Sequence, residues 1–136
     1  MSKSVNDLHH HTKQLPALTS QTISTDTTTA GAIIDTAGFE ACEFLLLSGT
    51  ITDGAYAVSL QEGDASNLSD AATVDAAEIL GDADFALADD DTAKRIGYIG
   101  KKRYVRLSIV SSGTTSGGVF AGIALLGMAA HQPTAD

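Results

Sequence analysis

The strongest constraint on the fold is a strict alternation of apolar and polar residues in the second half of the chain. Residues 104–110 read YVRLSIV, so that Val105, Leu107 and Ile109 are separated by arginine and serine and preceded by tyrosine. A period of two places these three aliphatic side chains on one face of a β-strand. We therefore expect that face to point into a hydrophobic core.

A second strand is expected directly after this one. Residues 111–118, SSGTTSGG, are short, polar and rich in glycine, which suits a reversal of the chain. Residues 119–128 are almost wholly apolar, yet they are about half as long as a membrane-spanning helix of about 20 residues. They predict a buried strand. Together with the short strand expected near Gly97 and Gly100, the sequence predicts a strand hairpin within residues 94–128.

The first half of the chain predicts a similar arrangement. The run Phe44 to Leu47 is flanked by polar residues, which is typical of a central strand. An Asp53-Gly54 turn follows it, and Tyr56, Val58 and Leu60 then share one face of a further strand. We expect a second hairpin here.

These patterns, with abundant threonine and only two prolines in 136 residues, favour an all-β fold. We expect a β-sandwich of about seven or eight strands, jelly-roll-like or of a related topology. The expected organisation is an extended amino-terminal arm over residues 1–20, a single sandwich domain over 21–130, and a carboxyl-terminal tail over 131–136. Residues 64–91 are expected to form loop and short strand, with a short helix over residues 71–80 as the alternative.

The leader shows neither helical nor strand periodicity. Leu15, Pro16 and Leu18 lie in a segment that proline keeps extended, and we expect them to contact a neighbouring subunit. The three histidines of residues 9–11 have no fixed geometry on such a leader, so an incidental role is favoured over metal binding.

Charge is divided between two neighbouring segments. The formal net charge is −9; nine of the 17 carboxylates lie in residues 63–91, whereas six of the eight lysines and arginines lie in residues 94–106. Lys101, Lys102 and Arg103 are expected to form ion pairs or to face a partner subunit. The acidic total argues against nucleic acid as a partner.

The acidic segment has two features that resemble sites by composition alone. Asp64, Asn67 and Asp70 do not follow the order of a calcium-binding loop, so a solvated loop is favoured. Three adjacent acids at 89–91 do not converge on one point, as acid–base catalysis would require. A solvated turn or an anchor for a basic partner is the expected role.

Residues for catalysis are few. All four histidines lie in the end segments, at 9–11 and 131, and the single cysteine, Cys42, stands at the start of an apolar strand. A lone cysteine excludes an internal disulfide and a cysteine-based metal cage, and its setting suits a small packed residue. We expect no enzyme activity, no catalytic residue, no metal and no cofactor.

Two segments resemble a family of small structural proteins encoded by tailed bacteriophages and prophages. The first is AIIDTAGFEACEFLLLSGTITDGAYAVSLQEGD, in which a strand, a Thr-x-Asp-Gly turn and a second strand ending in glutamate follow one another. The second is AKRIGYIGKKRYVRLSIVSSGTTSGGVFAGIALLG, which contains KRIGYIG at 94–100 and KRYVR at 102–106. Together they cover roughly half of the chain; residues 64–91 depart most from the family's pattern.

The resemblance implies a component of the virion, assembled in the host cytoplasm. The preferred role is a capsid decoration or cement protein on the head surface, where a homotrimer binds the major capsid protein and stabilises the lattice; no membrane partner is expected. A neck, tail or fibre-attachment protein is the nearest alternative. A carbohydrate-binding β-sandwich, which would use exposed aromatic platforms, is a more distant one.

Overall fold

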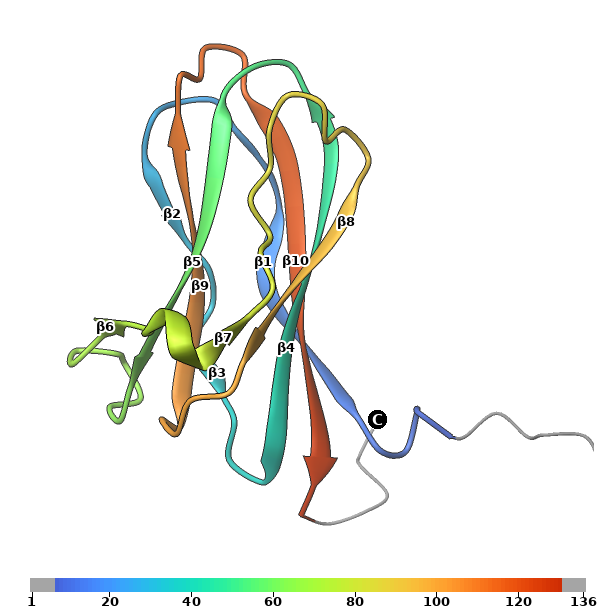
Figure 1. Cartoon of the computed structure of the whole chain (residues 1–136), viewed down its shortest axis with the longest axis vertical. Coiled ribbons are helices and arrows are strands. Elements are labelled where there is room, and N and C mark those ends of the chain that lie inside the picture. The colour runs from blue at the N-terminus through green and yellow to red at the C-terminus, as the bar shows by residue number, and fades with distance from the viewer. Residues whose placement is uncertain (1–6, 131–136) are drawn as a thin grey trace, which may run out of the picture.

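A computed structural model describes residues 7–130 of the chain as a sandwich of two antiparallel sheets. The strands run along the long axis of the molecule (Figure 1). They are β1 (Lys13–Ile23), β2 (Thr28–Ala30), β3 (Ile34–Asp35), β4 (Phe39–Ile51), β5 (Ala55–Gly63), β6 (Ala72–Thr73), β7 (Ile79–Leu80), β8 (Ala93–Tyr98), β9 (Tyr104–Ser112) and β10 (Gly118–Ala129), with one 3-10 turn, η1 (Ala76–Glu78). The all-β fold is thus confirmed. No helix in the described part of the chain is long and apolar enough to cross a membrane.

The order of the strands gives the sandwich its jelly-roll-like character. The first sheet, sheet A, has the order β1-β10-β4-β8-β7, and the second, sheet B, has β2-β9-β5-β6 with β3 also paired to β9. Successive long strands therefore alternate between the sheets: β4 lies in A, β5 in B, β8 in A, β9 in B and β10 in A. This winding of two stacked sheets is that of a double-sheet jelly roll.

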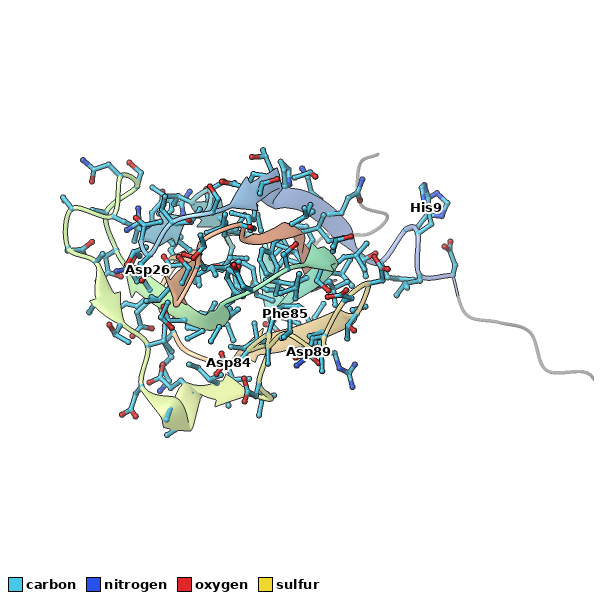
Figure 2. The ribbon with its side chains drawn as sticks, turned by 90° about the horizontal axis from the view of Figure 1, so that it is seen from above. His9, Asp26, Asp84, Phe85 and Asp89 are labelled. Carbon is cyan, nitrogen blue, oxygen red and sulfur yellow. The ribbon has the colours of Figure 1, made fainter. Side chains whose placement is uncertain are left out.

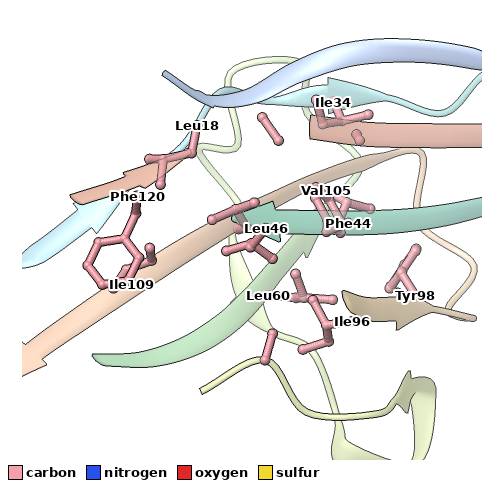
Figure 3. Packing of buried hydrophobic residues seen from close by; sticks show 14 of the residues in the cluster. Leu18, Ile34, Phe44, Leu46, Leu60, Ile96, Tyr98, Val105, Ile109 and Phe120 are labelled. Atoms are coloured by element: carbon pink, nitrogen blue, oxygen red, sulfur yellow. The ribbon is translucent and has the colours of Figure 1, made fainter. Parts of the chain in front are cut away.

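The core lies between the two inner faces, and the alternation read from the sequence defines its sheet B side. Val105, Leu107 and Ile109 are each fully buried, as expected. Across the core, Phe44 and Leu46 of β4 are also buried, and Figure 3 shows these side chains meeting between the sheets. Burial of such a set of aliphatic and aromatic groups supplies the main driving force for folding.

Both predicted hairpins are wrong. Strand β9 pairs with β5, β2 and β3, whereas β10 pairs with β1 and β4, so residues 113–117 connect the two sheets instead of joining neighbours in one sheet. In the same way residues 52–54 carry the chain from β4 in sheet A to β5 in sheet B. Three extended residues span about 10 Å, which is the usual distance between packed sheets. Turn chemistry therefore indicates a reversal without deciding which strands pair.

The predicted boundary of the amino-terminal arm at residue 20 is also wrong. Strand β1 begins at Lys13 and pairs with β10 from Lys13↔Leu126 to Ile23↔Gly118. Only residues 7–12 of the described chain precede it, and they project sideways from the body of the sandwich (Figure 1). Residues 1–6 and the predicted tail at 131–136 lie outside the described residues.

Residues 64–91 cover one open side of the sandwich and form loop, two short strands and the single turn η1, where the sequence predicted loop and short strand. Strand β6 extends sheet B and β7 extends sheet A. Between β7 and β8, Phe85 and Tyr56 exchange backbone hydrogen bonds of 2.8 and 2.9 Å. The Phe85 ring enters the core, where it lies 5.3 Å from the ring of Phe120. This segment therefore completes the core between the edges of β5 and β8.

Aspartate carboxylates hold the connections between the sheets. Asp53 accepts hydrogen bonds from the backbone N–H groups of Thr115, Ser116 and Gly117, at 2.9 to 3.0 Å. These bonds tie the β4–β5 connection to the β9–β10 connection. They also lower the pKa of the Asp53 carboxyl group, because they stabilise its charged form.

Gly117 and Gly113 permit a direct test of this packed turn. Both have positive φ, +91° and +65°, but a Cβ on Gly117 would lie 2.1 Å from the Ile23 carbonyl oxygen, whereas nothing lies within 4 Å of one on Gly113. We expect Gly113→Ala to lower the free energy of unfolding by about 1 kcal/mol through backbone strain alone. Gly117→Ala should lower it by at least about 3 kcal/mol, because steric overlap with the Ile23 carbonyl group adds to the strain. Urea unfolding of both variants measures the difference; equal losses would contradict the close packing around Gly117.

The Asp53 clamp predicts a particular response to acid. Because the pKa of Asp53 is lowered in the folded protein, its contribution is present above the unfolded-state pKa of about 3.9 and is lost as the pH falls through the folded pKa. The urea midpoint of Asp53→Asn should therefore lie below that of the wild type at pH 6, and the gap should close towards pH 2.5. A gap that is independent of pH would show that the charge of Asp53 is irrelevant.

Candidate interaction surfaces

The structure places the three predicted leader contacts, Leu15, Pro16 and Leu18, on β1, where they have different environments. Leu18 is buried in the protein's own core, and Leu15 is half-buried against it. Pro16 is exposed and pairs in register with Ile123 on the outer face of sheet A. Proline is tolerated here because β1 is an edge strand. Of the three residues, Pro16 is therefore the one best placed to contact another molecule.

The outer face of sheet A is apolar across four strands. Its apolar centre, which we call the sheet A face, consists of Pro16, Leu45, Leu47, Ala93, Ala121 and Ile123. These residues line a shallow groove of about 450 Å³. Leu47 and Ile123 have 55% and 41% of their surface exposed. An antiparallel sheet in a sandwich usually turns polar side chains outward, so this face is unusual for a surface open to water.

The outer face of sheet B is different. Arg106 and Gln61 lie side by side on it and are joined by hydrogen bonds of 2.6 and 3.0 Å. Ser108 pairs there with Ser59, and Val110 is the one large aliphatic residue, at 43% exposed. Sheet B thus has the polar outer face expected of a solvated sandwich.

The predicted basic cluster forms a short loop between β8 and β9, and two of its three cations are paired within the subunit. The Lys102 ammonium lies 2.8 Å from Asp64, and the Arg103 guanidinium donates two hydrogen bonds to Asp35, at 2.8 and 2.9 Å. The bond from Arg103 holds the pKa of Asp35 below its ordinary value. Lys101 is exposed and makes no ion pair with the described residues. This confirms ion pairing for Lys102 and Arg103.

A buried tyrosine holds the basic loop in place. The Tyr98 hydroxyl donates a hydrogen bond of 2.7 Å to Glu62 and accepts one of 2.9 Å from the backbone N–H of Lys102. Burial, followed by the bond to Glu62, raises the pKa of Tyr98 above its ordinary value. Beside the loop, a hollow of about 470 Å³ opens between residues 36–42 and residues 98–103. It is lined by both polar and apolar groups.

The remaining residues singled out in the sequence have local structural roles. Cys42 is buried, and burial together with the nearby charge of Glu43 raises the pKa of its thiol to about 12. Asp89 accepts a hydrogen bond from Ala86 N–H, and Asp90 accepts one from Ile51 N–H. The described residues contain no group of three or more histidine, cysteine or acidic side chains placed to share a metal ion.

The histidines of the leader lie far from the acidic turn at residues 89–91. His9 projects from the leader, away from the body of the sandwich, whereas Asp84 and Asp89 flank Phe85 on the side that residues 64–92 cover (Figure 2). His10 forms a hydrogen bond with Asp7, which lies three residues earlier. Asp89 is paired with Lys94 at 3.3 Å, so part of the acidic turn does anchor a basic residue, and that residue belongs to the same chain.

Sequence reasoning did not identify the sheet A face, although a signal for it was present. The runs Phe44 to Leu47 and 119–128 are apolar at consecutive positions, a pattern typical of strands covered on both faces. Both strands are central in sheet A, and their alternate residues are buried in the core. Leu45 and Leu47 of the first run, and Ala121 and Ile123 of the second, belong to the sheet A face. The continuous apolar runs therefore indicated that sheet A has an apolar outer face as well as an apolar inner face.

Comparison with known proteins adds no assignment. Neither the protein-family models nor the curated proteins give a match to this chain. The fold and the surfaces described above define the class, a jelly-roll-like β-sandwich with one apolar outer face.

Replacing Tyr98 with phenylalanine tests the support of the basic loop. Tyr98→Phe leaves the Lys102 N–H without its acceptor, so the free energy of unfolding should fall by about 1–2 kcal/mol and exchange of the Lys102 amide hydrogen should become faster. Tyr104→Phe is the matched control, because the Tyr104 hydroxyl makes no hydrogen bond with the described residues. Equal effects of the two substitutions would remove Tyr98 from this role.

Proposed function

We propose that this protein is a structural component of a tailed-bacteriophage virion, a decoration or cement protein that binds the major capsid protein on the head surface as a homotrimer. The observation that carries the proposal is where the two family-like segments lie in the fold. Residues 32–64 contain β3, β4 and β5, and residues 93–127 contain β8, β9 and nearly all of β10. The resemblance therefore falls on the central strands of both sheets and on the connections between them.

The surfaces support a role in protein contacts. The sheet A face presents an apolar groove, and apolar patches of this kind mark sites of protein association. Residues 7–12 extend beyond the sandwich and supply reach towards a neighbouring molecule (Figure 1). A protein that stabilises a lattice must bridge subunits, and many weak contacts repeated around the lattice give strong total binding.

The positions of the aromatic residues disfavour the carbohydrate-binding alternative. The chain has no tryptophan, and its three tyrosines and four phenylalanines all lie among the described residues. Tyr56 and Tyr98 are buried, and Tyr104 and Phe39 are half-buried. The other three phenylalanines belong to the core. A sugar-binding platform would need aromatic rings open to solvent.

Binding to capsids tests the proposal directly. Purified protein should be mixed with heads of the encoding phage or prophage that were assembled without it, and the product imaged. We expect density distributed over the capsid lattice at a fixed number of copies per capsomer. Density confined to one vertex or to the tail would favour the neck, tail or fibre-attachment alternative, and unchanged heads would overturn the proposal.

A truncation then separates the leader from the sandwich. Removing residues 1–12 leaves β1 and its pairing with β10 intact, whereas removing residues 1–20 would delete most of β1. If the leader bridges subunits, the shorter truncation should weaken capsid binding at least about tenfold, because a second linked contact is lost. Its urea midpoint should equal that of the wild type. Undiminished binding would exclude the leader from the contact.

A further inference from the structure

We propose that the sheet A face is the contact between copies of this chain. The proposal gives the expected homotrimer a surface, and to that extent it rests on the proposed function; self-association through this face nevertheless requires no capsid. Copies arranged around an axis can each direct this face inward, where the same apolar residues from every copy meet and exclude water. A closed ring of this kind leaves no copy of the face exposed.

The composition of the face excludes its being an ordinary solvated surface. Along the rows of the sheet, Pro16, Ile123 and Leu45 are successive neighbours on β1, β10 and β4, and Ala121, Leu47 and Ala93 form the next row on β10, β4 and β8. The first row is apolar until it reaches Arg95 on β8, and the three positions of the second row are all apolar. A continuous apolar patch of this type is typical of a site of protein association.

Two charges at the margin of the face indicate that the occupant is another copy. Arg95 pairs in register with Leu45, and Glu43 lies two residues before Leu45 on the same strand. Glu43 and Arg95 carry opposite charges, and neither side chain forms a hydrogen bond or ion pair with the described residues. A surface that carries one charge of each sign beside an apolar centre is complementary to itself. In a contact between copies, Arg95 of one subunit can meet Glu43 of another.

The charge on the rest of the molecule restricts where two copies can approach. The net charge is −9, and nine carboxylates lie in residues 63–91. Two copies that met through that segment would bring like charges together. The sheet A face and its margin carry no net charge, so contact there avoids this repulsion. A basic foreign partner, by contrast, would be attracted to the acidic segment and would gain nothing from the sheet A face.

Matched substitutions on the two outer faces test the contact in the absence of capsids. Ile123 and Val110 are both β-branched, lie on central strands of opposite sheets, and are 41% and 43% exposed. Wild-type protein at 1–100 µM should sediment as more than one 13.9 kDa chain. Ile123→Asp should weaken self-association at least about 30-fold, as expected for a central apolar contact, whereas Val110→Asp should leave it unchanged. Far-ultraviolet circular dichroism and urea unfolding establish that both variants are folded.

Reversal of the marginal charges tests whether the partner is a second copy. Glu43→Arg and Arg95→Glu each place like charges opposite one another, and each should weaken self-association about tenfold. The double variant restores opposite charges in a contact between copies and should return to within about threefold of the wild type. Binding of a foreign partner to the double variant would not recover, because the charges on that partner are unaltered.

The outcomes separate this proposal from that of capsid binding. A wild-type chain that remains monomeric, or an oligomer that Ile123→Asp leaves intact, would overturn the contact. If Ile123→Asp and the double charge variant lost capsid binding while self-association was unchanged, the face would be the site of a foreign partner, and the contact would again be overturned. An oligomer that depends on Ile123 but does not bind capsids would support the contact and refute the proposed function.

Discussion

The sandwich depends on satisfying backbone N–H groups where the chain crosses from one sheet to the other. Such connections are too short to form regular secondary structure, so their backbone N–H groups need acceptors other than a neighbouring strand. Aspartate carboxylates supply acceptors at these points. Asp53 binds three amides of the β9–β10 connection, and Asp26 accepts from both the N–H and the hydroxyl of Thr114 in the same connection. Each carboxylate thereby fixes the path of more than one loop.

Two buried serines act in the same way deeper in the structure. The Ser48 hydroxyl on β4 donates to the Asp89 carbonyl group and accepts from Thr92 N–H. The Ser111 hydroxyl on β9 donates to the carbonyl groups of Thr25 and Thr27 and accepts from Thr27 N–H. The serines are neutral, whereas each aspartate that accepts hydrogen bonds from a loop adds a negative charge. The net charge of −9 is therefore in part a consequence of how the loops are held.

The sequence predicted the fold class and the core better than it predicted the pairing of strands. Alternation identified Val105, Leu107 and Ile109 correctly, because a period of two depends only on which side chains share a face. It could not tell a hairpin from a crossing between sheets, since both place apolar faces against one core. Strand β1 was missed because it is an edge strand with mixed polarity: Ala17 and Leu18 are buried, whereas Thr19 and Ser20 are exposed.

The candidate surfaces were predicted only in part, and the reason lies in what an apolar run can mean. Lys102 and Arg103 were expected to form ion pairs, but their partners, Asp64 and Asp35, are distant in sequence and come together only through the fold. Residues 119–128 predicted a buried strand, and within one subunit only the inner face of that strand is covered. Leu47 and Ile123 are about half exposed, so covering each contributes about 1 kcal/mol, roughly half of the value for full burial. Repulsion between exposed carboxylates farther apart than about 8 Å is largely screened at physiological ionic strength. Contact through the sheet A face can therefore outweigh the repulsion between two acidic subunits.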